Sequence, residues 1–314
     1  MQDLKNWVER LRGGDTRALA RAISAVETGS PEARPLLQLL FPFSGKARII
    51  GLTGAPGVGK STLVDQLARQ YRKQDRTVGI IAVDPTSPFS GGAILGDRIR
   101  MQSNGADPGI YIRSMATRGA LGGLARTTAD VATVLDASGR DLILIETVGA
   151  GQDEVDIARL ADITVVVLVP GMGDDVQTIK AGIMEIANVF AINKSDREGA
   201  ERVERELLAM QSIAPRADRW TPPIVRTVAS EPRGIPELAE AIASYENHLV
   251  QRNLMARKQA ENWRDRLIEM LREAILQRLL RGDAGALERY AEEIVAHARD
   301  PYALVDELAG QWGK

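Results

Sequence analysis

Short apolar runs alternate with helical segments through the middle of this 314-residue chain. The runs are apolar on both faces, which is typical of parallel strands covered by helices on both sides of a sheet. The sequence therefore predicts an α/β fold of three layers with a mainly parallel sheet. The strands are expected at Arg48 to Thr53, Thr77 to Val83, Gly109 to Ile112, Asp141 to Thr147, Ile163 to Val169, Val189 to Asn193 and Ile224 to Val228.

The two ends of the chain show helical periodicity instead of strand patterns. Asp15 can cap one N-terminal helix, and Ser30 can cap another that runs to Leu40. After about Tyr245, apolar residues recur every three or four positions, which predicts a long amphipathic helix, and Asp300 can begin a further helix. We expect an N-terminal helical region at residues 1–45, an α/β domain at residues 46–245 and a C-terminal helical arm at residues 246–314.

A phosphate-binding loop follows the first expected strand. Residues 54–61 read Gly-Ala-Pro-Gly-Val-Gly-Lys-Ser and match the pattern G-x-x-x-x-G-K-[ST], and a helix is expected directly after them. Backbone N–H groups of such a loop and of the helix N-terminus point at phosphate oxygens. Lys60 would reach the β- and γ-phosphates, and the Ser61 hydroxyl would bind Mg²⁺. The pattern predicts a three-layer P-loop NTPase fold, with nucleotide contacts at Gly54, Ala55, Pro56, Gly57, Val58, Gly59, Lys60, Ser61 and Thr62.

A second motif indicates which base the nucleotide carries. Asn193, Lys194 and Asp196 end a later expected strand in the order N-K-x-D. The Asp196 carboxylate can accept hydrogen bonds from guanine N1–H and the 2-amino group, whereas adenine offers neither donor there. Lys194 would lie across the base, and Asn193 would tie this loop to the phosphate loop. We therefore expect GTP rather than ATP as the substrate.

Carboxylates for Mg²⁺ are expected at the same edge of the sheet, beyond the carboxyl ends of the strands. Asp84 and Glu146 end two of the expected strands, and Mg²⁺ prefers oxygen ligands of this kind, often through water. Beside Glu146, a glycine-containing segment reaches Gln152 and can respond to the γ-phosphate. We assign the catalytic roles to Lys60, Glu146 and Gln152.

Longer strings outside these motifs resemble the MeaB/ArgK family of P-loop GTPases, and the resemblance covers nearly the whole chain. Members of that family are GTPase chaperones of adenosylcobalamin-dependent acyl-CoA mutases such as methylmalonyl-CoA mutase, and they form homodimers through the C-terminal region. The strings that carry the resemblance are residues 84–88 (DPTSP), 91–98 (GGAILGDR), 113–119 (RSMATRG), 146–152 (ETVGAGQ) and 170–177 (PGMGDDVQ).

The resemblance implies GTP binding and hydrolysis coupled to cofactor loading, protection and reactivation of a partner mutase. Asp97 then lies in the first switch and serves the metal, and the backbone N–H of Ala229 lies beside the base. A third mobile segment would relay the nucleotide state to the mutase through Asp174, Gln177 and Lys180. The sequence shows no obvious internal arginine finger; Arg113 and Arg118 are candidates for a partner interface, or ordinary surface arginines.

Composition narrows the alternatives. The chain has no cysteine and two distant histidines, so it lacks the thiolate or imidazole cluster of a metal-insertion GTPase that delivers nickel. A kinase of the same fold is the other alternative, but no acceptor pocket is evident. A net charge of −2 supplies no general field for nucleic acid or a membrane surface. We find no secretory signal and no apolar run of membrane-spanning length, and expect a cytoplasmic protein.

Overall fold

The computed structural model describes residues 2–84, 107–116, 123–147, 160–171, 185–213, 218–280 and 285–310. The side chains of residues 84, 116, 123–125, 277 and 279 lie outside this description. The chain divides into two compact units, residues 1–259 and residues 260–314.

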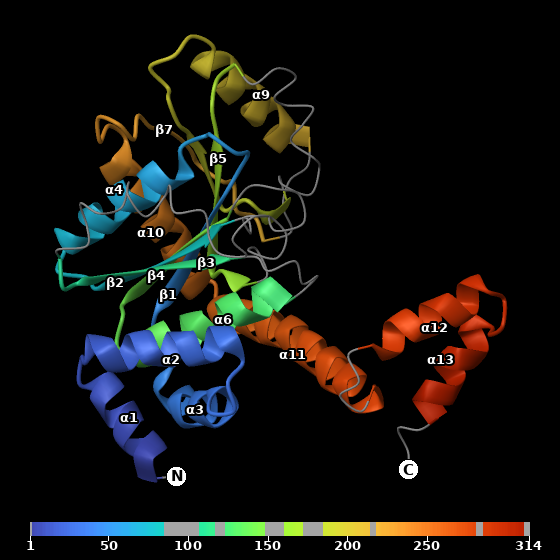
Figure 1. Cartoon of the computed structure of the whole chain (residues 1–314). Coiled ribbons are helices and arrows are strands. Elements are labelled where there is room, and N and C mark those ends of the chain that lie inside the picture. Colours follow the sequence, from blue (N-terminus) through green and yellow to red (C-terminus); the bar gives the residue numbers. More distant parts are fainter. Residues whose placement is uncertain are drawn as a thin grey trace. The chain divides into compact units, whose positions relative to one another are not determined.

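The described residues of the first unit build a parallel sheet of seven strands in the order β3-β2-β4-β1-β5-β6-β7, which confirms the expected fold class (Figure 1). Strand β1 lies at its centre, between β4 and β5, where chain connections leave toward both sides of the sheet. Such a position favours ligand binding at the carboxyl ends of the strands. The strands are β1 Arg48–Thr53, β2 Val78–Asp84, β3 Ile110–Ala116, β4 Leu142–Glu146, β5 Ile163–Leu168, β6 Val189–Ile192 and β7 Ile224–Arg226.

Strand β3 is longer than its apolar run predicts. All seven of its residues pair with β2, from Ile110 opposite Val78 to Ala116 opposite Asp84. The sequence pattern ends at Ile112 because a polar arginine and serine follow. β3 is an edge strand of the sheet, and the Arg113 side chain finds polar partners on a neighbouring helix.

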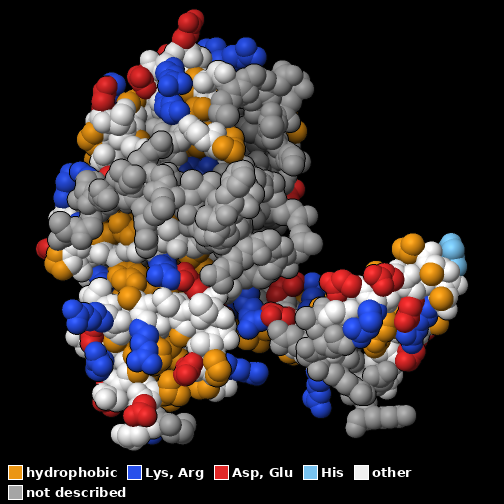
Figure 2. Space-filling view, in the orientation of Figure 1, with side chains coloured by type: hydrophobic (Ala, Val, Ile, Leu, Met, Phe, Trp, Pro, Cys, Tyr) orange, Lys and Arg blue, Asp and Glu red, His pale blue; other side chains and the backbone are white. Residues whose placement is uncertain are grey.

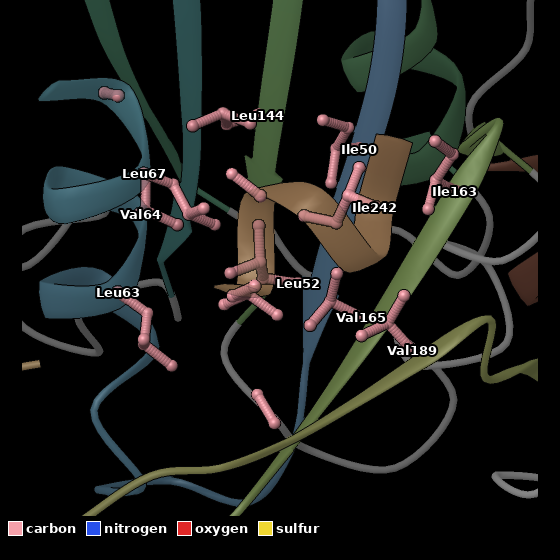
Figure 3. Close-up of a cluster of buried hydrophobic side chains, with 14 of the residues drawn as sticks. Ile50, Leu52, Leu63, Val64, Leu67, Leu144, Ile163, Val165, Val189 and Ile242 are labelled. Carbon is pink, nitrogen blue, oxygen red and sulfur yellow. The ribbon is translucent and has the colours of Figure 1, made fainter. Parts of the chain in front are cut away.

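One face of the sheet is covered by α4 (Lys60–Arg72) and α10 (Ile235–Gln251). Their apolar side chains form a buried cluster with alternate residues of the central strands. Figure 3 shows Ile50 and Leu52 of β1 in this cluster together with Leu63 of α4 and Ile242 of α10. This packing fixes the start of α4 against the end of β1. The phosphate loop that joins them is therefore held at the carboxyl edge of the sheet.

The opposite face carries α6 (Gly123–Ala137) and α9 (Ala200–Ile213). The N-terminal helices α1 (Gln2–Arg12), α2 (Thr16–Thr28) and α3 (Ala33–Leu40), with a short 3₁₀ turn η1 at Phe41–Phe43, pack outside α6 (Figure 1). Their buried apolar residues belong to the same cluster as residues of α6, β2 and β4. The first unit thus includes the N-terminal helices as an added layer.

The caps of the N-terminal helices agree with the sequence in one case and correct it in another. Asp15 caps α2 as predicted, because its Oδ1 accepts hydrogen bonds from the N–H groups of Arg17 and Ala18 at 2.9 and 3.1 Å. The prediction that Ser30 caps the third helix is wrong, since α3 begins at Ala33. Ser30 instead completes the end of α2, where its N–H donates to the Ala25 carbonyl at 3.0 Å.

The C-terminal part of the chain is helical. It contains α11 (Met255–Leu279), which begins in the first unit, and α12 (Ala286–Val295) and α13 (Pro301–Gly310) in the second. The Asp300 carboxylate accepts from the Ala303 N–H at 2.7 Å and so starts α13 at the predicted position. Among the described helices, none has the length and apolar character needed to cross a membrane.

A carboxylate at the end of α6 fixes the entry of the chain into β1. The buried Asp136 side chain accepts hydrogen bonds from three consecutive backbone N–H groups, those of Gly45, Lys46 and Ala47, the last two at 3.2 and 2.9 Å. A carboxylate with several N–H partners is a strong acceptor. The N-terminal helices and the central strand therefore meet at one charged anchor.

Replacing Asp136 tests this anchor. We expect Asp136→Ala to lower the free energy of unfolding by roughly 2–4 kcal/mol, because three backbone donors lose their shared acceptor. Asp136→Asn retains an amide oxygen and should lose less. Urea denaturation of the three proteins measures the difference, and an Asp136→Ala variant as stable as the wild type would contradict the anchor.

Candidate functional site

The phosphate loop closely approaches the neighbouring strand β5. Gly54 has φ +146°, and a Cβ atom placed there would lie 2.2 Å from the carbonyl oxygen of Val167 in β5. Any side chain at this position would force the loop away from the sheet. The strand beside the loop therefore requires glycine at the first position of the motif.

The first turn of α4 is left available to an anion. Gly59 stands at its N-cap and provides no side-chain hydrogen bond to the backbone N–H groups that follow. The buried Lys60 amine donates to the carbonyl oxygens of Gly54 at 2.7 Å and Ala55 at 3.0 Å. A positive charge and a helix N-terminus therefore converge on the same loop.

Ser61 and Glu146 come together beside this turn. The Ser61 hydroxyl donates to Glu146 Oε1 at 2.5 Å, which joins α4 to the end of β4, and Glu146 is only 7% exposed. A hydroxyl and a carboxylate are both hard oxygen donors, so this pair suits Mg²⁺. In the sheet, Glu146 pairs with Ala82 of β2, which places Asp84 two residues further along the adjacent strand.

The base-recognition loop is tied directly to the phosphate loop. Asn193 Nδ2 donates to the Val58 carbonyl at 2.8 Å, and Lys194 Nζ donates to the Gly57 carbonyl at 2.7 Å. A Cβ at Gly59 would lie 2.5 Å from Asn193 Nδ2, so only glycine leaves room for this contact. Lys194 has a φ of +54°, an uncommon backbone conformation for a lysine. Two loops that are far apart in sequence form one hydrogen-bonded unit.

Ala229 completes this unit from the end of β7. Its N–H donates to Asn193 Oδ1 at 3.1 Å, and the turn around it is closed by hydrogen bonds between Val228 and Arg233. Gly234 ends the turn with φ +75°, and a Cβ there would lie 2.0 Å from the Arg226 carbonyl oxygen. The backbone around Ala229 is therefore held tightly.

The remaining residues from the sequence stand as follows. Asp196 and Thr62 are exposed, at the base-recognition loop and in the first turn of α4. The backbone of Asp84 ends β2, but its side chain lies outside the described residues. The candidates that lie entirely outside the described residues are Asp97, Arg118, Gln152, Asp174, Gln177 and Lys180.

The Arg113 side chain forms hydrogen bonds within the fold and does not stand free at the surface. Its Nε donates to Glu27 Oε1 at 2.7 Å, and its Nη2 donates to Glu27 Oε2 and Ser24 Oγ, which links β3 to α2. The hydrogen bond with Glu27 holds the pKa of Arg113 above its usual value. The sequence pattern gives no sign of this pair, because the two partners are 86 residues apart.

Thr227 belongs to this site but is part of none of the sequence motifs. Thr227 is fully buried, and its hydroxyl lies 3.3 Å from Asn193 Oδ1. A threonine at the end of an apolar strand carries no distinctive spacing. Only the pairing of β6 with β7 brings it to the asparagine.

No three His, Cys, Asp or Glu side chains gather into a metal-binding group within the part of the chain that the structure describes. The hydroxyl and carboxylate pair of Ser61 and Glu146 is a different arrangement, one that can hold a metal together with phosphate oxygens.

Comparison with known proteins gives consistent matches. Residues 19–284 match the family model described as "Methylmalonyl Co-A mutase-associated GTPase MeaB". A putative GTPase of Pyrococcus horikoshii is 45% identical over 98% of this chain and 97% of its own length. The GTPase ArgK of Escherichia coli is 35% identical over 78% of this chain and 77% of its own. The crystal structure of a LAO/AO transport system kinase matches with a TM-score of 0.75 and 25% identity, over 100% of this chain and 99% of the other.

The contact between Gly59 and Asn193 can be tested by substitution. We expect Gly59→Ala to weaken binding of a fluorescent guanine nucleotide more than tenfold, because the added methyl group overlaps the asparagine amide. Gly14→Ala is the matched control, since Gly14 also has a positive φ, of +88°, but has open space at its Cβ position. Equal affinities for the two variants would count against the contact.

Proposed function

The chain belongs to the MeaB family of P-loop GTPases, and on that premise we propose that its GTPase activity serves an adenosylcobalamin-dependent acyl-CoA mutase of the methylmalonyl-CoA mutase type. The family description, which names a mutase-associated GTPase, supports this partner. In this proposal GTP binding and hydrolysis govern cofactor loading, protection and reactivation of the mutase.

The observation that carries the nucleotide assignment is the direct joining of the two loops. Backbone N–H groups of the phosphate loop, in which Pro56 alone has none, would hold the phosphates, Asp196 would read the guanine edge, and Lys194 would lie against the base. Asn193 and Lys194 donate to carbonyl groups of the phosphate loop, so base and phosphate sites share one scaffold. A guanine nucleotide would span the two loops.

For hydrolysis we propose that water attacks the γ-phosphate and that the bond to the β-phosphate oxygen breaks, giving GDP and phosphate. The Lys60 ammonium neutralises charge on the β- and γ-phosphate oxygens. Ser61 and Glu146 would hold Mg²⁺, with Asp84 and Asp97 as further ligands, and the ion would offset phosphate charge when bound. Gln152 belongs to the segment after Glu146 that would orient the water.

Coupling to the mutase is assigned to the segment that follows β5. We propose that Asp174, Gln177 and Lys180 contact the partner or relay the nucleotide state to it. Strand β5 lies beside β1, and its Val167 carbonyl borders the first glycine of the phosphate loop.

Two other functions fit the fold less well. Delivery of a soft metal needs thiolate or imidazole ligands, and the chain contains no cysteine and two histidines, at positions 248 and 297. A kinase activity is suggested by the name of one structural relative. It would require a site for a phosphate acceptor beside the γ-phosphate.

We further propose that the protein is a homodimer joined through its second unit. Helices α11 to α13 carry apolar side chains between 37% and 80% exposed, and Figure 2 shows hydrophobic groups among charged ones on this unit. Covering such side chains with a second copy removes apolar surface from water. They are Trp263, Leu267, Ile268, Met270, Leu271, Leu276, Leu287, Val295, Tyr302 and Val305.

The base assignment is tested by Asp196→Asn. The asparagine oxygen can still accept from N1–H, which guanine and xanthine share. Its NH₂ group would face the guanine 2-amino group, donor against donor, but can donate to the C2 carbonyl of xanthine, so GTP affinity should fall by roughly 100-fold while affinity for xanthosine triphosphate rises. Competition binding with both nucleotides measures the change. Ser195→Ala on the same loop serves as the control and should bind GTP normally. A retained preference for GTP in Asp196→Asn would refute the assignment.

The partner assignment is tested by turnover. We expect purified protein to hydrolyse GTP slowly and to be stimulated about tenfold or more when a methylmalonyl-CoA mutase is added, because a partner can complete and order the site. ATP is the control substrate, and Lys60→Ala is the control variant that lacks the phosphate-binding amine. A GTP turnover unchanged by saturating mutase would contradict the proposed partner.

A further inference from the structure

The asparagine that joins the base and phosphate loops also forms a hydrogen bond with a buried hydroxyl group. Asn193 is 2% exposed, and Thr227, the residue directly after β7, is completely buried beside it. The Thr227 Oγ1 donates to Asn193 Oδ1 at 3.3 Å. The same oxygen accepts the Ala229 N–H at 3.1 Å, so its two acceptor positions are both used.

The backbone of Thr227 is fixed independently of its hydroxyl. Its N–H donates to the Ile192 carbonyl at 2.8 Å, and its carbonyl accepts from the Ser195 N–H at 3.1 Å. These two bonds lie on either side of Asn193 in sequence. The threonine hydroxyl is therefore presented to the asparagine from a rigid strand end.

The orientation of the Asn193 carboxamide determines what the phosphate loop receives. With Oδ1 held by Thr227 and Ala229, Nδ2 faces the Val58 carbonyl and donates to it at 2.8 Å. A carboxamide that turns about its last bond would direct an N–H group toward the Ala229 N–H and lose this donation. Thr227 and Ala229 restrict that rotation, and they thereby maintain the hydrogen bond that holds the two loops together.

We propose that Thr227 is a positioning residue for guanine-nucleotide binding, whose hydroxyl holds the Asn193 carboxamide on the phosphate loop. It touches no part of the nucleotide itself. This inference rests on the proposed assignment of Asn193 and Asp196 to the guanine site. It adds a residue outside the N-K-x-D and phosphate-loop patterns to the machinery that binds GTP.

The test begins with Thr227→Val, which keeps the shape and removes the hydroxyl. We expect affinity for fluorescent GTP and GDP analogues to fall about three- to tenfold, the loss typical of one buried hydrogen bond. Thr227→Ser restores a hydroxyl and should bind within about twofold of the wild type. Thr164→Val is the matched control: Thr164 is also a buried threonine, but it lies near the start of β5, where its backbone N–H donates to Asn188 Oδ1.

Repeating the measurement in an Asn193→Ala protein distinguishes a positioning role of Thr227 from a general effect on the fold. If Thr227 acts through the asparagine, Thr227→Val should change affinity by less than twofold when Asn193→Ala is already present. An equal loss in both backgrounds, or failure of Thr227→Ser to restore binding, would overturn the inference. So would a Thr227→Val protein that binds like the wild type.

Thermal unfolding of each variant confirms that binding is measured on folded protein. Should Thr227→Val not fold, Thr227→Ala is measured in its place, with and without Asn193→Ala. Failure of the underlying site assignment has a separate signature, because the wild-type protein would then show no preference for GTP over ATP. If the wild type prefers GTP but Thr227→Val binds it with wild-type affinity, the positioning role is refuted and the site assignment stands.

Discussion

The proposed nucleotide site depends on the hydrogen bonds from Asn193 and Lys194 to the carbonyl groups of Val58 and Gly57. Their acceptors belong to the backbone of the phosphate loop, so the loop cannot shift without moving the base-recognition loop. Gly59 permits the close approach because a side chain there would occupy the place of the Asn193 amide. The loops proposed to bind phosphate and base therefore form one hydrogen-bonded unit.

This unit is held by the sheet from which its loops arise. Strands β1, β4 and β6 are parallel, so their carboxyl ends bring the phosphate loop, Glu146 and Asn193 to one edge. Burial on both faces fixes the strands: α4 and α10 cover one side, and α6 with the N-terminal helices covers the other. Asp136 joins that outer layer to the start of β1.

Much of this arrangement could be predicted from the sequence because its signals are local. The apolar runs located all seven strands of the described sheet, and the spacing of residues 54–61 and 193–196 gave the two loops. The contacts between distant segments could not be predicted. No residue near Arg113 in the sequence indicates that its partner is Glu27. The sequence around Ser30 is typical of a helix N-cap, but in the structure Ser30 bonds to the end of α2. Asp97 and Gln152 lie outside the described residues, so the roles predicted for them stay predictions.

The buried polar groups at the base loop explain why selectivity and rigidity go together here. Asn193 and Thr227 lie almost entirely out of water, where an unpaired polar atom would be costly, so their hydrogen bonds must be made in the folded protein. Those same bonds leave the asparagine little freedom to adapt to a different loop position. A ligand that fits both loops is bound without rearranging them, whereas a ligand that fits only one must break a buried network. In the proposed guanine site, discrimination between nucleotides would then follow from the cost of deforming the site as well as from contacts with the base.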